Sequence, residues 1–300
     1  MRFVCVGHAT YDVILPLDEY PKEDRRYKTN KKVECGGGPA ATACYLLAKW
    51  GMDATFVGIV GNDHYGSKIM KEFNEVGINT DYIEKNNFLS TDVSYIVANS
   101  SSGSRTVVTA KGQKIDKLYE PNTIDDADYI LVDGTHIETA KEVINNNPNA
   151  ITVLDAGHVN EETEQLGNMV NYFICSKDYA EAYTQKVIDF NNLNSIAEVY
   201  EMLYMNFKTN IIITLGEKGV FTKTDKYILI PTDKVKVVDS TGAGDIFHGA
   251  FTYFIANNYS IEDAIKYANK AAAISTERIG SRNAIVDVNE IVGNKNVEYL

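Results

Sequence analysis

One short segment, Val238 to Phe251, constrains this chain more than any other, because it combines a glycine turn, the start of a helix and an acidic residue. Valines at 235–238 precede the turn and predict the end of a strand, whereas the apolar residues from Phe247 to Ile255 recur at helical spacing. The glycines therefore mark a strand-to-helix turn. There the free amides of Gly242, Ala243 and Gly244, with the positive end of the helix dipole, can hold phosphate oxygens.

Asp245 follows these glycines directly. A carboxylate beside a phosphate site costs electrostatic repulsion, so its presence is best explained if it takes a proton from an alcohol that attacks the phosphate. The alternative is a structural acid that complements the helix dipole in the first turn. The complete string favours the catalytic role.

The whole chain fits an enzyme of the cytoplasm. With 300 residues and 44% hydrophobic content it can bury a sizeable core, and its net charge of −12 disfavours nucleic-acid and anionic-membrane partners. The four cysteines are scattered and predict buried thiols in a reducing compartment rather than a disulfide frame or zinc site. The segment Met1–Gly7 predicts a strand, too short for a signal peptide or a membrane span.

Apolar runs of strand length alternate with helical patterns, which predicts an α/β fold with a mostly parallel central sheet flanked by helices, in one domain over residues 1–300. The predicted central strands are 55–60, 129–132, 151–154, 172–175 and 210–214, with helices such as 67–76, 138–145 and 196–207. Residues of about 13–34 and 92–110 do not follow this alternation of strands and helices. They predict a small accessory β-sheet, the second segment being a hairpin around Ser101 to Gly103.

A second glycine-rich segment, Cys35 to Gly51, begins with Gly36-Gly37-Gly38 before Pro39. Proline suits a first helical turn and Gly51 a helix end, so these glycines also lead into a helix and let a ligand reach the backbone. Upstream, Asp12 is predicted to end the first strand. Its carboxylate can accept two hydroxyl protons of a polyol, although a turn-forming role is the alternative.

The string Asp239 to Asp245 resembles the second signature of the ribokinase-like (PfkB) carbohydrate and nucleoside kinases, and Gly36 to Gly51 resembles their first signature. The resemblance implies Asp245 as catalytic base and the 242–244 amides as an anion hole. It also implies that Asp12, Gly37, Gly38 and Thr42 bind the sugar. The accessory sheet would form a lid over the sugar and a homodimer contact; a merely decorative surface hairpin is the alternative.

Two positions depart from the family pattern. Thr42 stands where an Asn is usual, and the segment around it is similar to that of kinases of sulfonated ketoses. Ser176 to Tyr179 replace the Asn-x-x-Glu that usually serves magnesium in the family. The magnesium contacts therefore remain open, with Asp178 or Glu181 as candidates to order its water. The hairpin and residues 153–180 resemble ketohexokinases.

The resemblance also locates the nucleotide. Segment 214–220 resembles the turn that lines the ATP site, and 268–276 with Gly280 resembles the adenine side. The implied nucleotide residues are Thr214, Gly216, Gly219, Asn269, Ala273 and Gly280. K⁺ would bind through the carbonyls of Asp239 and Thr241. The planar fork of Arg105 suits an anionic sugar group or a nucleotide phosphate.

These observations predict an ATP-dependent kinase that uses Mg²⁺, and in many relatives K⁺, to phosphorylate a hydroxyl of a ketose or related sugar, neutral or anionic. Basic residues at 25–32 either form a solvated face or attract a phosphorylated or sulfonated substrate. A nucleoside kinase of the same fold and a catalytically inactive ligand-binding regulator are the alternatives. A nicotinamide enzyme is disfavoured because no Gly-x-Gly-x-x-Gly follows the first strand.

Overall fold

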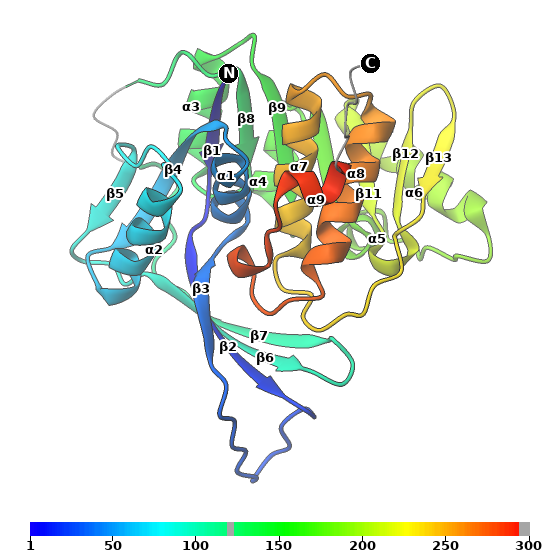
Figure 1. Cartoon of the computed structure of the whole chain (residues 1–300). Helices are drawn as coiled ribbons and strands as arrows, with labels where there is room; N and C mark the ends of the chain where they lie inside the picture. The colour runs from blue at the N-terminus through cyan, green and yellow to red at the C-terminus, as the bar shows by residue number, and fades with distance from the viewer. Residues whose placement is uncertain (119–122, 294–300) are drawn as a thin grey trace, which may run out of the picture.

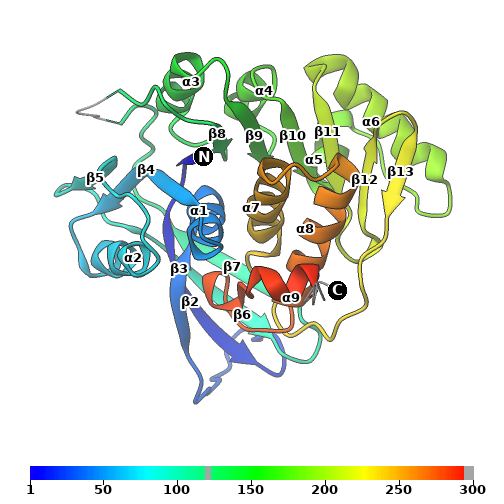
Figure 2. The ribbon, with the colours of Figure 1, turned by 45° about the horizontal axis from the view of Figure 1, so that its top comes forward.

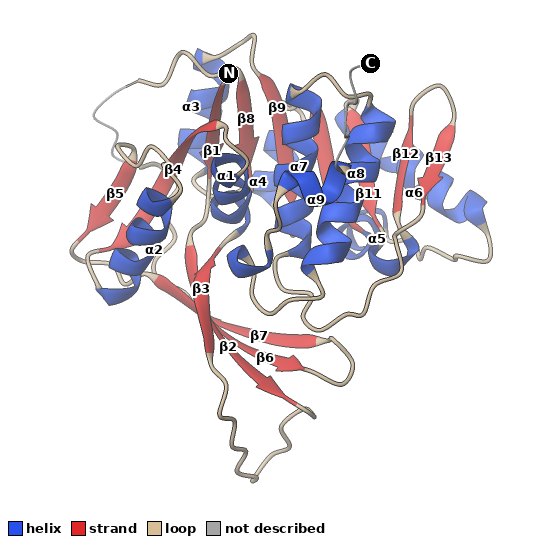
Figure 3. Ribbon diagram, viewed as in Figure 1, coloured by secondary structure: helices blue, strands red, loops and turns tan. Residues whose placement is uncertain are grey.

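The predicted central strands join one large sheet, shown in Figures 1 and 3. The computed structural model describes residues 1–118 and 123–293; residues 119–122 and the end of the predicted 1–300 domain, 294–300, are outside it. The nine strands of the sheet lie in the order β13-β12-β11-β10-β9-β8-β1-β4-β5. They are β1 (Arg2–Val6), β4 (Asp53–Gly61), β5 (Ile83–Asn86), β8 (Tyr129–Val132), β9 (Ile151–Ala156), β10 (Tyr172–Ser176), β11 (Asn210–Thr214), β12 (Val220–Lys223) and β13 (Tyr227–Ile230).

Neighbouring strands from β5 to β11 are parallel, and β12 and β13 add an antiparallel edge. Successive side chains of a strand point to opposite faces. On β1, Val4 and Val6 therefore pack with α3 to α6, whereas Phe3 and Cys5 pack with α1 and α2; α7 and α8 cover the same face as α1 (Figure 2). The helices are α1 (Pro39–Lys49), α2 (His64–Glu75), α3 (Ile137–Asn146), α4 (Glu161–Gly167), α5 (Lys177–Thr184), α6 (Leu193–Phe207), α7 (Ala243–Ala256), α8 (Ile261–Ser275) and α9 (Val288–Val292).

The chain changes direction across the sheet beside β1. From β1 it moves to β4 and β5 on one side, then returns to β8 and continues through β9, β10 and β11 on the other. Open α/β sheets bind ligands at the carboxyl ends of the strands where the order reverses. Here that point lies between His8, just after β1, and Asp133, just after β8.

A second sheet of four strands, in the order β3-β2-β6-β7, projects from the main body (Figure 1). Its strands are β2 (Thr10–Leu17), β3 (Val33–Gly37), β6 (Asp92–Asn99) and β7 (Arg105–Ala110). The predicted hairpin is confirmed, with β6 antiparallel to β7. The sheet begins at Thr10, earlier than expected, and Asp12 lies inside β2 rather than at the end of the first strand. Residues 18–32 form a loop rather than a strand.

The predicted strand at Val235–Val238 is wrong, because residues 231–242 form no strand. The amides of Val238 and Asp239 both donate to the carbonyl of Thr276, at 2.7 and 3.0 Å, so they do not pair with a neighbouring strand. The glycine turn is thus a loop-to-helix junction. Among the described residues, no helix is long and apolar enough to cross a membrane.

Candidate active site

Residues Asp239 to Gly244, called the anion turn here, lead into α7 through Gly242. The φ of Gly242 is 75°, in the left-handed region, and a Cβ there would lie 2.5 Å from the Cβ of Ser281. Within the described chain, the amides of Gly242 and Gly244 have no acceptor, and the amide of Ala243 makes only a long bond of 3.4 Å to the Ser240 carbonyl. These donors at the positive end of α7 suit phosphate oxygens.

Asp245 occupies the first turn of α7. Its side chain is only part-buried by surface area, yet the surrounding protein desolvates it enough to raise its pKa to about 7. The negative charge of Asp155 adds to the rise, and His248 opposes it. A carboxyl group with a pKa near neutrality is well matched to general-base catalysis at neutral pH.

A buried pair, Asp155 and His248, lies next to Asp245. The Nδ1 of His248 is 3.2 Å from Oδ2 of Asp155 and 2.6 Å from the carbonyl oxygen of Gly244. Burial raises the pKa of Asp155 to about 8 and lowers the pKa of His248. Because His248 contacts the carbonyl of the residue before Asp245, the pair fixes the first turn of α7 and the direction of its amides.

Asp12 and Gly36–Gly38 form a second element of the site, called the glycine platform here. Asp12 is buried and accepts hydrogen bonds from Oγ1 of Thr10 at 3.1 Å and Oγ of Ser281 at 3.3 Å. Burial raises its pKa, and these donors and the charge of Arg282 limit the rise. Gly38 has a φ of 91°, and a Cβ there would lie 2.3 Å from the carbonyl oxygen of His8. Only glycine therefore allows this approach.

An ion pair between the buried Arg282 and the half-buried Glu72 supports the platform. The guanidinium of Arg282 donates through Nη1 to Oε2 of Glu72 at 2.9 Å and through Nη2 to the carbonyl of Gly37 at 3.1 Å. Both carboxylate oxygens of Glu72 accept from the amide of Gly36, at 3.0 and 2.9 Å. Arg282 also lies over the ring of Phe73 at 4.6 Å. The shape of the platform is thus set by contacts within the protein.

Residues 280–282 connect the platform to the anion turn. The amide of Gly280 donates to Oδ2 of Asp239 at 2.9 Å, while Oδ1 of Asp239 accepts from the amide and hydroxyl of Thr241 at 3.0 and 2.6 Å. The hydroxyl of Ser281 donates to the carbonyl of Gly36 at 2.9 Å. Three consecutive residues therefore hold both halves of the site in register. The carbonyl oxygens of Asp239 and Thr241, proposed K⁺ ligands, accept no hydrogen bond from the described chain.

A cavity of about 660 Å³ opens onto the anion turn at Ala243 and Gly244. It brings together five of the six residues that the sequence assigned to the nucleotide: Thr214, Gly216, Gly219, Asn269 and Ala273. Asn269 is held by Nδ2 donating to the carbonyl of Pro231 at 3.0 Å. The sixth, Gly280, lies outside this lining, beside Asp239. The volume falls within the range of small-molecule sites.

The tip of the β6–β7 hairpin reaches the anion turn. The guanidinium of Arg105 donates to the hydroxyl of Ser240, and the hydroxyl of Ser240 lies 3.4 Å from the carbonyl of Gly103. The positive charge of Arg105 lowers the pKa of Asp245. The structure therefore places Arg105 at the anion turn, in contact with Ser240.

Thr42 differs from expectation. Thr42 is fully buried in α1, its amide donates to the carbonyl of Gly38 at 2.8 Å, and its hydroxyl has no partner in the described chain. Since that hydroxyl is inaccessible, Thr42 is not presented to a sugar; helix packing around α1, which a local motif does not encode, decides its exposure.

The side chains at the Asn-x-x-Glu position, Ser176 and Tyr179, likewise make contacts elsewhere in the protein. The hydroxyl of Ser176 caps α5 by accepting from the amide of Tyr179 at 3.1 Å, and Tyr179 is buried in the core. Glu181 pairs with Lys177 at 3.0 Å and accepts from the amide of Ile188 at 2.7 Å, while Asp178 is exposed. In the described ranges no three His, Cys, Asp or Glu side chains converge as a metal site. Two carboxylates, Asp155 and Asp245, remain near the turn, and carboxylate oxygens suit Mg²⁺ that arrives with nucleotide phosphates.

Sequence reasoning missed Asp133, which accepts from the amides of His8 at 2.8 Å and Ala40 at 3.1 Å. It also missed Asp155. Both directly follow or end predicted strands, so the rule that carboxyl ends of parallel strands carry site residues could have found them. Glu72 and Arg282 gave no such signal, because they meet only in the folded chain.

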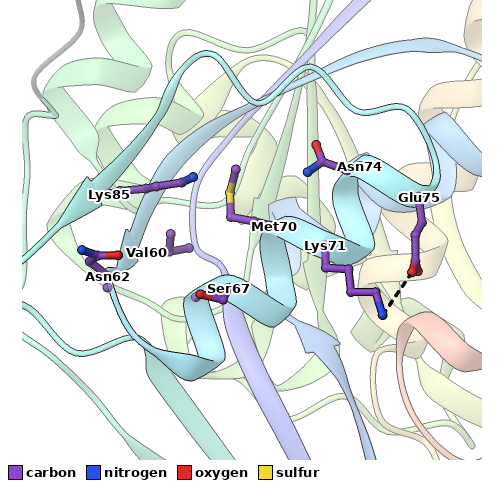
Figure 4. A pocket seen from close by; sticks show the side chains of 10 residues that line it. Val60, Asn62, Ser67, Met70, Lys71, Asn74, Glu75 and Lys85 are labelled. Carbon is purple, nitrogen blue, oxygen red and sulfur yellow. Dashed lines mark ion pairs between the residues drawn. The ribbon is translucent and has the colours of Figure 1, made fainter.

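A separate surface hollow of about 510 Å³ lies between α2 and the β4–β5 pair (Figure 4). Its labelled side chains include Asn62, Ser67 and Lys85, and Lys71 pairs with Glu75 at 3.7 Å on its rim. None of the residues around the anion turn lines it. The hollow is therefore not part of the candidate active site.

Comparison with known proteins agrees with this geometry. A model of the pfkB family of carbohydrate kinases matches residues 2–288. The ribokinase of Bacillus subtilis is 28% identical over 302 residues, covering 97% of this chain and 98% of that protein. The ATP-dependent ribose-1-phosphate kinase of Halopiger xanaduensis is 27% identical, covering 95% of each.

Among solved structures, a putative ribokinase from Agrobacterium tumefaciens superimposes with a TM-score of 0.88. It is 24% identical and covers 97% of this chain and 96% of its own, so this likeness establishes the fold.

Proposed function

The chain belongs to the pfkB family of carbohydrate kinases and is an ATP-dependent phosphotransferase, and from this premise we propose that Asp245 deprotonates a sugar hydroxyl that attacks the γ-phosphoryl group of ATP. One observation carries the proposal: a carboxyl group with a pKa of about 7 stands beside amides that have no acceptor within the described chain. The nucleotide would occupy the cavity that reaches those amides, and the glycine platform would hold the sugar. Charge on the moving phosphoryl group would be stabilised by the amides of the anion turn.

The acceptor we propose is a neutral pentose or ketose. The carboxyl groups of Asp12 and Asp245 lie at the platform and at the anion turn, and in their ionised form they repel an anionic sugar. The relatives named above act on ribose or ribose 1-phosphate. The ketose resemblance comes from the hairpin and the segment 153–180, so both sugar types belong in the same screen.

The ions and the lid are part of the same proposal. Magnesium would arrive with ATP, neutralising its phosphate charge, and K⁺ would use the carbonyls of Asp239 and Thr241. The small sheet would cover the sugar and exclude water. Its edge strand β7 exposes 46% of Val107 and 64% of Val108, which supports the proposed homodimer contact there.

A coupled assay of ADP release tests the function. The panel contains ribose, deoxyribose, fructose, a sulfonated ketose, ribose 1-phosphate and three ribonucleosides, each with and without K⁺. We expect turnover with a neutral sugar or a nucleoside and none when Mg²⁺ is chelated. If none of the acceptors in the panel led to ADP release, the result would contradict the proposal and favour an inactive ligand-binding regulator.

A nucleoside kinase is the second candidate, because a further cavity lies beyond the platform at the switch point of the sheet. In the same assay, a nucleoside preferred over every free sugar would select it.

A further inference from the structure

The tip of the β6–β7 hairpin, residues 99–105, contacts a loop of the nucleotide cavity. This loop, residues 231–238 and called the cavity loop here, leads from β13 to the anion turn, and Figures 1 and 2 show the hairpin tip beside it. Five residues of the cavity loop line the nucleotide cavity: Thr232, Asp233, Lys234, Val235 and Val237. The small sheet therefore reaches the nucleotide side of the enzyme as well as the glycine platform.

Gly103 is the point of closest approach. Its φ is 70°, and a Cβ at this position would lie 2.4 Å from Cγ1 and 3.0 Å from Cβ of Val237. Valine is branched at Cβ and has few alternative rotamers, so its methyl group could not turn away freely. The backbone of the hairpin tip thus packs directly on a side chain that lines the nucleotide cavity.

Arg105 adds a polar contact between the hairpin tip and the anion turn. Its guanidinium donates to the hydroxyl of Ser240, which also lines the nucleotide cavity. The positive charge of Arg105 lowers the pKa of Asp245, so the hairpin tip acts electrostatically on the proposed base. A shift of the tip would therefore be felt at the cavity loop and at the anion turn.

The same hairpin is joined to the acceptor side of the site. Strand β6 pairs with β2 along its whole length, and beyond it the amide of Ser100 donates to the carbonyl of Leu17 at 2.8 Å. Strand β2 carries Asp12 and pairs in turn with β3, which ends at Gly37 of the glycine platform. Strands that are hydrogen-bonded in one small sheet move as a unit. The small sheet thus connects Asp12 with the hairpin tip.

The cavity loop is held loosely by the rest of the protein. In the part of the chain that the structure describes, residues 232–237 make no backbone–backbone hydrogen bond. The hydroxyl of Thr232 donates to the carbonyl of Gly216 at 2.9 Å, and the amide of Lys236 makes a long bond of 3.4 Å to Glu277. Segments with so few backbone hydrogen bonds shift at low cost. A nucleotide packed on Val237 would fix this loop in the position that the hairpin tip contacts.

We propose that the hairpin tip links the two ligand sites, so that a nucleotide in its cavity raises the affinity for the acceptor, and the acceptor raises the affinity for the nucleotide. Gly103 and Arg105 are then positioning residues, which act through Val237 and Ser240 without touching either ligand. The two factors must be equal, because coupling between binding sites is reciprocal. The proposal rests on the sugar-kinase function above. A lid that only covered the sugar would give no such coupling.

Calorimetry tests the link. The Kd of ribose is measured with and without saturating adenylyl imidodiphosphate and Mg²⁺, and the Kd of this ATP analogue with and without ribose. If another acceptor in the panel is turned over faster, it replaces ribose. The variants are Gly103→Ala, which places a Cβ against Val237, and Arg105→Met, which cannot donate to Ser240. Gly77→Ala is the matched control, because Gly77 has a φ of 80° and no atom within 4 Å of an added Cβ.

In the wild type we expect each ligand to tighten the binding of the other by about tenfold. Gly103→Ala and Arg105→Met should each reduce this factor below about twofold while the Kd of each ligand alone changes little. Adding Val237→Ala to Gly103→Ala removes the clashing Cγ1 and should restore part of the factor. Gly77→Ala should keep it in full.

Two results would overturn the proposal. One is independent binding of the two ligands in the wild type. The other is a full coupling factor in both Gly103→Ala and Arg105→Met. If Arg105→Met weakened binding of the analogue alone and kept the factor, Arg105 would contact the phosphates directly, and its assignment as a positioning residue would be wrong.

Hydrogen exchange with the nucleotide analogue alone separates this proposal from the kinase function. The amides of Ser102 and Gly103 donate to the carbonyl of Asn99 at 3.2 and 2.8 Å, so their exchange reports opening of the hairpin tip. We expect slower exchange there when the analogue and Mg²⁺ bind to the wild type, but not to Arg105→Met. That result with no turnover of any acceptor would refute the proposed function and retain the link. Turnover with unchanged exchange at the tip would refute the link and retain the function.

Discussion

The glycine platform and the anion turn both place glycines ahead of a helix, but the partners of their backbone groups differ. At the platform, the amide of Gly36 is held by Glu72 and the carbonyls of Gly36 and Gly37 by Ser281 and Arg282. At the anion turn, the amides of Gly242 and Gly244 have no acceptor within the described residues. The platform thus has its shape before any ligand binds, whereas the anion turn obtains its missing partners from the ligand.

The strongest test of this difference replaces the acid beside the open amides. In Asp245→Asn the amides and the fold remain but the proton acceptor is lost, so we expect kcat to fall by about a thousandfold or more. Affinity for a non-hydrolysable ATP analogue, measured by calorimetry, should change little. Asp263→Asn, which alters a first-turn acid of α8, is the matched control and should keep kcat. Activity close to wild type in Asp245→Asn would show that Asp245 is only a helix-dipole acid.

The platform is tested through the ion pair of Arg282 and Glu72. Arg282→Met leaves the half-buried Glu72 carboxylate without its cation, which we expect to lower the free energy of unfolding by about 1–3 kcal/mol. The double variant Arg282→Met with Glu72→Gln removes both charges and should recover most of that loss. Chemical denaturation measures both variants. Equal destabilisation of the single and double variants would mean that packing of Arg282 on Phe73, rather than its charge, stabilises the platform.

At the anion turn, the pH dependence of activity and that of stability should have opposite signs, because Asp245 controls the first and its neighbour Asp155 the second. Asp245 must be ionised to accept a proton, and its pKa is raised to about 7, so kcat/KM should fall about tenfold per pH unit below that value. Stability should move the other way. Asp155 has its folded-state pKa raised to about 8, so its stabilising contribution is complete below the ordinary value of 3.8 and is lost as pH rises toward 8.

Thermal unfolding from pH 5 to pH 8 checks the second part of this prediction. The wild type should lose more stability over that interval than Asp155→Asn, which has no carboxyl group to titrate there. Equal slopes in the two proteins would contradict the raised pKa of Asp155.

The smallest expected effect concerns the connection between the regions. Ser281→Ala keeps the Cβ that packs on Gly242 but removes the hydroxyl that reaches Gly36 and Asp12. Losing the hydrogen bond to the Gly36 carbonyl and the longer one to the Asp12 carboxyl group should cost about 1 kcal/mol, seen as a roughly fivefold rise in the KM of the sugar with little change for ATP. Ser275→Ala, which removes a buried hydroxyl of α8 that donates to the carbonyl of Ala272, is the control. A larger change for ATP than for the sugar would place Ser281 functionally with the anion turn.

The strands of the large sheet could be predicted from the sequence because each is a short apolar run. The strands at 129–132 and 210–214 were predicted with the observed bounds, and the hairpin was located by its Ser-Gly turn. The valines at 235–238 carry the same apolar pattern, yet the carbonyl of Thr276 takes the amides that a strand would have used. A local pattern cannot distinguish these two outcomes.

The parts of the site that could be predicted are those whose residues lie close together in the sequence. The glycines, Asp245 and the residues around the nucleotide cavity lie in short segments, whereas Glu72 and Arg282 are separated by much of the chain and meet at 2.9 Å. The burial of Thr42 depends on how α1 packs against its neighbours. Contacts of this kind are properties of the folded chain and leave no mark on any one stretch of sequence.

The loop at residues 280–282 also has a consequence for biosynthesis. A domain generally folds as a unit, and the ribosome adds about 5–20 residues per second. The platform strands and the anion turn are both made before Gly280, Ser281 and Arg282 exist to hold Gly36, Gly37 and Asp239. A growing chain therefore carries both signature segments while the two halves of the site are still unconnected, and the enzyme becomes competent only after residue 282 has left the ribosome.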